Sequence, residues 1–274
     1  MTETRSLLGH YPLVVTDLDG TLLDRESYSF AAALPALEEL QRRGIPLILN
    51  SSKTAIEILE LQRALGIQAP FIAENGAGLY RVTAAGDSQL WHSFAMEREL
   101  VLGQLRELRD EHQYGFTGFA DMSPDQISAC TGLTPAQAVA AAARAFSEPL
   151  QWQDTAERLQ LFLGQIAAVG LCAAQGGRFL TVTGPCNKGA AMQALLQELG
   201  TLDRAYVVAL GDSPNDIELL QAADVAVIIR SVHGEKLQVE GPARVIRSQA
   251  EGPSGWQEVM QTLLAEPALQ TERL

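Results

Sequence analysis

The chain has 274 residues, of which 47% are hydrophobic and 19% are charged. This composition supplies enough apolar material for a sizeable core and excludes a wholly disordered chain. The formal net charge is −13 and there is no run of Lys or Arg, whereas a nucleic-acid-binding protein needs a basic surface to meet phosphates. A phosphate-ester substrate would need a bound cation to reverse this negative field locally.

Membrane insertion and secretion are not expected either. No stretch approaches the about 18 uninterrupted apolar residues of a membrane span. The N-terminal run MTETRSLLGHYP lacks the basic and then apolar build of a signal peptide. Three cysteines without CxxC spacing, Cys130, Cys172 and Cys186, predict neither a disulfide framework nor a structural zinc site. We therefore expect a cytoplasmic protein that binds neither membranes nor nucleic acid.

An alternation of strands and helices opens the chain. Short apolar segments predict buried strands, and segments with leucines at helical spacing, each followed by glycine, predict helices. In chain order these are strand 12–16, helix 30–43, strand 45–49, helix 55–65 and strand 71–73. The alternation predicts an α/β fold with a doubly wound parallel sheet of the Rossmann-like kind.

The alternation stops after residue 82 and returns after Gly184. The segment between predicts helices over 98–112 and 135–146, with short strands such as 159–162. Beyond it, the expected elements are helix 188–199, strand 205–210, helix 216–222 and strand 225–229. We therefore expect a core domain of residues 1–82 and 184–274, interrupted by an inserted domain of residues 83–183.

Acidic loops follow two of the predicted strands, at the edge where open parallel sheets place their sites. Asp17 and Asp19 follow the first strand in DLDGT, and such a pair of hard oxygen ligands suits Mg²⁺. A solvated turn is the alternative for this run. Asp212 and Asp216 follow a later strand in GDSPND, where a helix start with Pro214 in its first turn explains the same residues.

A hydroxyl and an ammonium complete the set. Ser51 can donate to a phosphoryl oxygen, and Lys188 can offset the charges of a nucleophile and a phosphate. Taken alone, Ser51 is better explained as a helix N-cap and Lys188 as a surface lysine. The occurrence of all four groups in this order, on one alternation of strands and helices, favours a site.

This combination resembles the haloacid dehalogenase-like phosphatase superfamily. The matching pieces are DLDGT at 17–21, the strand ending in Ser51, Lys188 at a helix start and GDSPND at 211–216. The resemblance implies that Asp17 is the nucleophile, which forms an aspartyl-phosphate, and that Asp19 is the general acid and base. The implied Mg²⁺ ligands are Asp17, Asp19 and Asp212, with Asp216 supporting them; Ser51 and Lys188 would hold the phosphoryl group beside Gly20.

Spacing gives the place of the insert. The 33 residues between Asp17 and Ser51 hold only a loop, a helix and a strand. The 136 residues between Ser51 and Lys188 leave about 90 to 100 beyond two strand–helix units. An insert of this size after the third strand resembles the α+β, type-two cap of the superfamily, a lid that excludes water and reads the leaving group.

Within the superfamily, the chain is most similar to the mannosyl-3-phosphoglycerate phosphatase family. Four stretches carry this likeness: SSKT at 51–54, AENGA at 73–77, GGRF at 176–179 and EGPSGW at 251–256. It implies a phosphorylated sugar-glycerate substrate, with mannosylglycerate and phosphate as products. Glucosyl-3-phosphoglycerate or another sugar phosphate stays open. A receiver-like signalling domain is a second alternative, which the chain length, the insert and the Asp-x-Asp spacing disfavour.

A phosphoglycerate ester also needs a cation for its carboxylate. Lys53 and Arg178 are the candidates, because a guanidinium suits bidentate carboxylate recognition. We further assign Gly20, Asn75 and Asn215 to substrate binding. The alternatives are a solvated strand residue for Arg178 and a plain turn at Asn75.

Overall fold

The structure is a computed structural model that describes residues 11–176 and 178–269. The chain divides into two compact units. The first unit contains the described residues up to Ser51, Ala69–Phe71 and the described residues from Asn187 onward; the second contains Ser52–Gln68 and the described residues of Ile72–Cys186. The expected boundaries of the inserted domain, at residues 83 and 183, stay a prediction.

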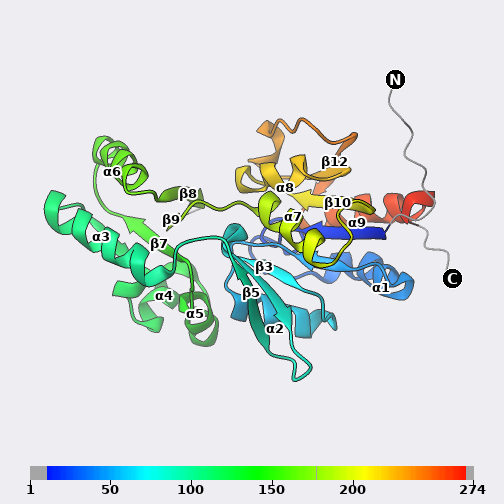
Figure 1. Cartoon of the computed structure of the whole chain (residues 1–274), viewed down its shortest axis with the longest axis horizontal. Helices are drawn as coiled ribbons and strands as arrows, with labels where there is room; N and C mark the ends of the chain where they lie inside the picture. Colours follow the sequence, from blue (N-terminus) through cyan, green and yellow to red (C-terminus); the bar gives the residue numbers. More distant parts are fainter. Residues whose placement is uncertain (1–10, 177, 270–274) are drawn as a thin grey trace. The chain divides into compact units, whose positions relative to one another are not determined.

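The first unit is built on a five-stranded sheet with the order β12-β11-β10-β1-β2 (Figure 1). Its strands are β1 Tyr11–Thr16, β2 Leu47–Leu49, β10 Ala205–Gly211, β11 Val225–Arg230 and β12 Arg244–Glu251. All neighbouring strands run parallel. The central strand β1 is buried after its first residue, as expected for a sheet covered on both faces. The predicted parallel core is therefore confirmed.

Helices cover this sheet in two packed pairs, α1 with α9 and α7 with α8. Their bounds are α1 Leu34–Arg43, α7 Lys188–Glu198, α8 Ile217–Gln221 and α9 Gly252–Leu264. A 3-10 turn, Ala31–Ala33, precedes α1, and another, Pro214–Asp216, precedes α8. Each predicted helix is therefore present, and the first and third begin as tighter 3-10 turns.

The third predicted strand exists but lies in another sheet. β3 Phe71–Ala73 belongs to a three-stranded sheet with β4 Gly78–Val82 and β5 Ser88–Ser93. β4 and β5 form an antiparallel hairpin. The three apolar residues of β3 correctly predict a buried strand, but a segment this short contains no information about its partner, and the tight turn after it brings β4 alongside.

The second unit begins with helix α2 Ala55–Leu65. Thr54 caps its first turn by accepting a hydrogen bond from the Glu57 amide at 3.2 Å, and the Glu57 carboxylate accepts one from the Thr54 amide at 2.9 Å. This reciprocal pair satisfies two amides that the helix itself leaves without partners. The helix ends before Gly66, as predicted.

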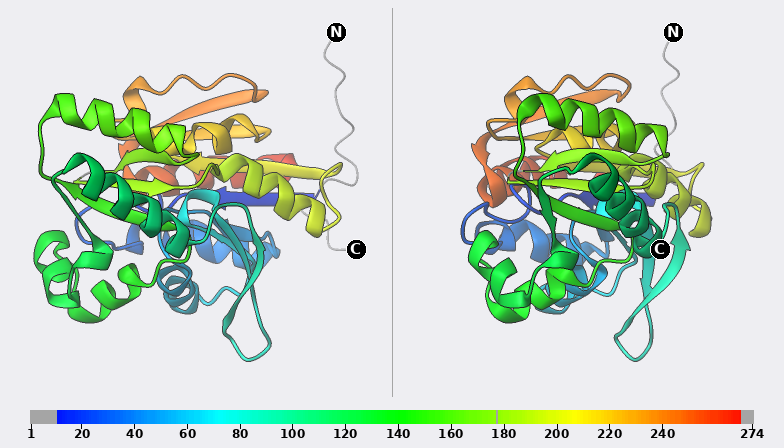
Figure 2. Two further views of the ribbon diagram at one scale, coloured as in Figure 1. Left: turned by 60° about the vertical axis from the view of Figure 1, so that its left-hand side comes forward. Right: turned by 90° about the vertical axis from the view of Figure 1, so that its left-hand side faces the viewer.

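A four-stranded antiparallel sheet, in the order β6-β7-β9-β8, forms the larger part of the second unit. Its strands are β6 Phe116–Gly118, β7 Ser147–Trp152, β8 Cys172–Gly176 and β9 Phe179–Thr183. Helices α3 Arg98–His112 and α6 Ala156–Ala168 lie side by side and share one hydrophobic core with the sheet (Figures 1 and 2). Helices α4 Pro124–Thr131 and α5 Pro135–Ala142 pack on each other. The insert is thus the predicted α+β cap.

The strand expected at residues 159–162 is wrong, because these residues lie inside helix α6. Leu159 and Leu161 mimic an alternating strand pattern, but the Leu161 side chain is 62% exposed. The buried residues of the helix are Phe162 and Ile166, which are one helical turn apart. The helix expected over 135–146 also ends earlier, at Ala142.

A search of the described residues for a helix with the length and hydropathy of a membrane span found none.

Trp256 supports the core of the first unit, and its removal is our first prediction. The side chain is fully buried, and its indole Nε1 donates to Thr16 Oγ1 at 3.1 Å. We expect Trp256→Ala to lower the free energy of unfolding by about 3–5 kcal/mol, because it leaves a cavity beside β1 and removes the hydrogen bond that Thr16 Oγ1 accepts. Urea denaturation followed by circular dichroism measures this. Trp91→Ala, at a partly exposed position of β5, is the control; equal losses in both variants would contradict the prediction.

Candidate active site

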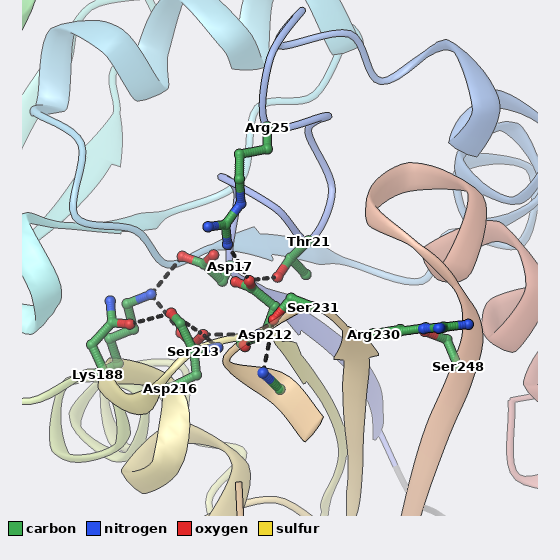
Figure 3. A network of polar contacts seen from close by, with 12 residues as sticks. Asp17, Thr21, Arg25, Lys188, Asp212, Ser213, Asp216, Arg230, Ser231 and Ser248 are labelled. Atoms are coloured by element: carbon green, nitrogen blue, oxygen red, sulfur yellow. Dashed lines mark hydrogen bonds and ion pairs between the residues drawn. The ribbon is translucent and has the colours of Figure 1, made fainter. Parts of the chain in front are cut away.

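A buried lysine joins two carboxylates at the carboxyl edge of the core sheet (Figure 3). Lys188 is the first residue of α7 and is fully buried. Its Nζ donates to Asp17 Oδ1 at 2.5 Å and to Asp216 Oδ1 at 2.7 Å. A buried ammonium is tolerated only with such partners, since its removal from water costs several kcal/mol. Lys188 is therefore part of the acidic site and not the surface lysine of the alternative interpretation.

Backbone hydrogen bonds fix the strand ends that carry these groups. The Asp17 amide donates to the Leu210 carbonyl at 2.9 Å, so the end of β1 is tied to the end of β10. The Asn50 amide donates to the Thr16 carbonyl at 2.9 Å, and the Asn50 side chain donates to the Lys188 carbonyl at 3.0 Å. Asn50 thereby links the end of β2, the end of β1 and the start of α7.

The loop after β10 wraps around the Asp216 carboxylate. Asp216 Oδ2 accepts hydrogen bonds from the amides of Asp212 and Ser213, both at 3.0 Å. Ser213 and Pro214 begin the helical turn here, as the helix-start interpretation expects. Because the other Asp216 oxygen accepts from Lys188, this one carboxylate holds both the loop and the lysine, and the two sequence interpretations are compatible.

Asp212 presents its carboxylate on the other side of the site. Its side chain is fully buried and accepts from Arg25 Nη2 at 2.7 Å and from Thr21 Oγ1 at 3.4 Å. The Asp212 carbonyl accepts from Ser231 Oγ at 2.8 Å, and Ser231 Oγ in turn accepts from the Gly234 amide at 2.8 Å. The loop after β11 therefore holds the backbone of Asp212 in place.

The acidic group fits a divalent cation. Asp17, Asp212 and Asp216 each offer a carboxylate oxygen, and these oxygens lie within 4.8 Å of one another. Three carboxylates are the hard donors that Mg²⁺ prefers. Gly20, at a φ of +82°, leaves room in front of them, since a Cβ there would lie 2.9 Å from Asp212 Oδ2. A side chain at this position would crowd the Asp212 carboxylate.

Burial makes this group costly to ionise without a cation. Burial, followed by the neighbouring Asp216 charge, raises the pKa of Asp17 to about 8, although Lys188 opposes the change. Burial and Asp216 also raise the pKa of Asp212, with Arg25 opposing. The pKa of Lys188 is raised by Asp17 and Asp216 against its burial, so the ammonium stays charged. A divalent cation would remove the repulsion that raises both carboxyl pKa values.

The remaining predicted residues of the first unit lie in the same loops. Asp19 and Gly20 form the turn after β1, where Asp19 bridges to Leu23. Ser51 is fully buried and follows Asn50 at the end of β2. Asn215 accepts from Ser213 Oγ at 2.5 Å. Their assigned roles stay predictions.

The predicted substrate-binding residues Lys53, Asn75 and Arg178 belong to the second unit. Lys53 Nζ lies 3.9 Å from Glu57 Oε1. Arg178 is exposed and its Nη1 donates to the Cys130 carbonyl at 2.9 Å. Gly177, quoted with Arg178 in the GGRF stretch, lies outside the described residues. Substrate binding by these three side chains stays a prediction.

Asn75 lies in an unusual backbone turn. Glu74 and Asn75 have φ angles of 51° and 60°, a left-handed conformation that costs non-glycine residues energy. The buried Glu74 carboxylate holds the turn by accepting from the Ala145 amide at 2.8 Å, the Phe146 amide at 3.1 Å and Ser147 Oγ at 2.6 Å. Strained residues held this firmly are typical of functional sites.

Sequence reasoning missed three residues of the acidic site: Asn50, Ser231 and Arg25. Ser231 follows the predicted strand 225–229 and could have been found by the rule that located the other loops. Asn50 directly precedes Ser51 and was passed over for the hydroxyl beside it. No pattern marked Arg25, because its partner Asp212 is 187 residues away along the chain.

A family model described as haloacid dehalogenase-like hydrolase matches residues 14–117 and 131–237. This match covers well over half of the chain and includes every acidic-site loop described above.

Solved structures share the fold. SMU.1108c from Streptococcus mutans is 20% identical with a TM-score of 0.66, covering 93% of this chain and 99% of its own. A haloacid dehalogenase-like hydrolase from B. subtilis is 19% identical with a TM-score of 0.62, covering 92% of this chain and 99% of its own. BT1666 from Bacteroides thetaiotaomicron, described among phosphatases of this superfamily, is 18% identical with a TM-score of 0.66, covering 96% and 97%. At this identity the likeness shows the fold alone.

The raised pKa of Asp17 leads to our second prediction, on metal binding. Burial raises the pKa of Asp17 to about 8, and a bound cation favours the charged form of this carboxyl. We therefore expect Mg²⁺ affinity to increase between about pH 6 and about pH 8, with release of a proton on binding. Isothermal titration calorimetry in two buffers of different ionisation heat measures both effects. A constant affinity without buffer-dependent heat over this range would contradict the prediction.

Proposed function

The chain belongs to the haloacid dehalogenase-like hydrolase family, and we propose that it is a Mg²⁺-dependent phosphomonoesterase. Family membership confirms the prediction that the protein is an enzyme of this hydrolase superfamily. The observation that carries the proposal is the buried lysine between Asp17 and Asp216, beside Asp212. This arrangement offers a carboxylate for attack and positive charge for a phosphoryl group at one edge of the sheet.

In the proposed reaction, an Asp17 carboxylate oxygen attacks phosphorus and the bond from phosphorus to the leaving alcohol oxygen breaks. Asp19 gives its proton to that oxygen, so the alcohol leaves neutral. Asp19 then takes a proton from water, whose oxygen attacks phosphorus and breaks the bond to Asp17. Phosphate is released and both carboxyl groups return to their starting forms.

The other groups of the site support this sequence. Lys188 orients the Asp17 carboxylate at 2.5 Å and supplies charge for the phosphoryl oxygens. Ser51, at the end of the neighbouring strand, donates its hydroxyl to the same oxygens. Asp17, Asp212 and the Asp19 backbone carbonyl would hold Mg²⁺, with Asp216 in support, and the ion would supply charge neutralisation for the attack of one anion on another.

The substrate we propose is mannosyl-3-phosphoglycerate, on the likeness of the SSKT, AENGA, GGRF and EGPSGW stretches. Lys53 and Arg178 are the cations proposed to bind its carboxylate. Glucosyl-3-phosphoglycerate and other sugar phosphates are the alternatives with the same chemistry. The chain length, the inserted second unit and the Asp-x-Asp spacing of Asp17 and Asp19 disfavour the receiver-like alternative.

Asp17→Asn is the direct test of the chemistry and our third prediction. The amide keeps the shape of the carboxylate but cannot attack phosphorus, so we expect Mg²⁺-dependent hydrolysis of p-nitrophenyl phosphate to fall by at least about 10³-fold. Circular dichroism should show an intact fold. Asp203→Asn makes the same change at an exposed position of the same unit and should keep full activity. Retention of more than about a tenth of the rate in Asp17→Asn would remove it from the nucleophile role.

Arg178→Ala tests the substrate and is our fourth prediction. The kcat/KM for mannosyl-3-phosphoglycerate, its glucosyl analogue and hexose phosphates is compared in one series. Loss of a charge-assisted contact should lower kcat/KM for the phosphoglycerate esters by about 10- to 150-fold. Hydrolysis of p-nitrophenyl phosphate, which has no carboxylate, should change by less than about threefold.

The control for this series is Arg81→Ala, an exposed arginine of the same unit, which should affect no substrate. Equal losses for Arg178→Ala on all substrates would assign Arg178 to the fold or the phosphoryl group. No loss on any substrate would remove it from carboxylate binding. A preference of the wild-type enzyme for hexose phosphates would contradict the proposed substrate but not the phosphatase chemistry.

A further inference from the structure

Arg25 is the one side-chain cation besides Lys188 that the described residues pair with the acidic site. Its Nη2 lies 2.7 Å from Asp212 Oδ2 (Figure 3). A Cβ at Gly20 would lie 2.9 Å from that oxygen and 3.0 Å from Arg25 Nη2. The guanidinium therefore pairs with a carboxylate oxygen of Asp212, one of the three residues that would hold a divalent cation.

A closed loop delivers Arg25 to this position. The Gly20 amide donates to the Leu23 carbonyl at 2.9 Å, and the Asp24 amide donates to the Ser29 carbonyl at 2.9 Å. The Asp24 side chain also accepts from the Ser27 amide at 2.8 Å. These bonds hold the backbone on both sides of Arg25, so its place beside Asp212 is built into the turn after β1.

The two ends of the ion pair differ in exposure. The Asp212 side chain is fully buried, whereas the Arg25 side chain is 55% exposed. Breaking the ion pair therefore costs Arg25 little free energy, because its guanidinium moves into water. It would leave the Asp212 carboxylate buried without a cation, which is strongly unfavourable. When all three carboxylates are ionised, they carry a net charge of −1 together with Lys188 and Arg25. A divalent cation in place of Arg25 makes the group neutral.

We propose that Arg25 holds the Asp212 carboxylate in the metal-free enzyme and is displaced from it when Mg²⁺ binds. Arg25 is thus a positioning residue that keeps the metal site formed before the metal arrives and sets its affinity. The inference rests on the proposed Mg²⁺ site. By exchanging one cation for another, the enzyme avoids an uncompensated buried carboxylate in either state.

The test measures Mg²⁺ binding by isothermal titration calorimetry at one pH and one salt concentration, without substrate. Arg25→Ala should bind Mg²⁺ about three- to tenfold more tightly than wild type, because no ion pair has to break. Arg25→Lys, which keeps the charge, should lie closer to wild type. Arg42→Ala is the matched control; its guanidinium pairs with Glu39 on α1, and the variant should bind Mg²⁺ as wild type does.

Thermal melting separates displacement from a general effect of charge. Without Mg²⁺, Arg25→Ala should melt at a lower temperature than wild type, and at saturating Mg²⁺ the two should melt together. Unchanged or weaker Mg²⁺ binding by Arg25→Ala, or a deficit that persists at saturating Mg²⁺, would overturn the proposal. If the wild-type protein binds no Mg²⁺, the metal site is wrong and Arg25 displacement is wrong with it. If it binds Mg²⁺ as expected but hydrolyses no phosphate ester, the proposed function is wrong and Arg25 displacement still stands.

Discussion

The ammonium of Lys188, enclosed between Asp17 and Asp216, is the interaction on which the site depends. Taking this charge out of water is unfavourable by several kcal/mol, and only two short contacts to carboxylates offset it. The same carboxylates repel each other and stay ionised more easily because the lysine lies between them. The three residues come from the ends of β1 and β10 and the start of α7, so the charge balance and the packing of the first unit depend on each other.

The strand-end rule explains why most of this site could be predicted from the sequence. Asp17, Asp212 and Asp216 each follow a buried apolar run, and parallel strands bring their carboxyl ends to one edge. Arg25 could not be predicted, because an arginine in a polar turn is ordinary and its partner is distant in sequence. Ser231 obeys the rule but carries no charge, which is why it was overlooked.

Most of the fold of the first unit could also be predicted from local sequence patterns. Local patterns identified the helices and strands of the core, but not which strands pair: β3 has the composition of a core strand and pairs with β4 instead. In the second unit, Leu159 and Leu161 have the alternating spacing of a strand, but Leu161 is exposed and both residues lie in helix α6. The Glu74 contacts reach residues more than 70 positions away, and no local pattern contains such a partner.

The order of strands in the core sheet has a consequence for how the protein is made. β1 pairs with β10 along its whole length, from Tyr11 with Ala205 to Thr16 with Leu210. During synthesis, β1 therefore lacks its partner β10 until residues after 205 have left the ribosome. The antiparallel sheet of the second unit needs no residue beyond Cys186 and has all its partners earlier. Translation thus completes the antiparallel sheet of the second unit before the core sheet of the first, and one edge of the apolar strand β1 lacks its partner until then.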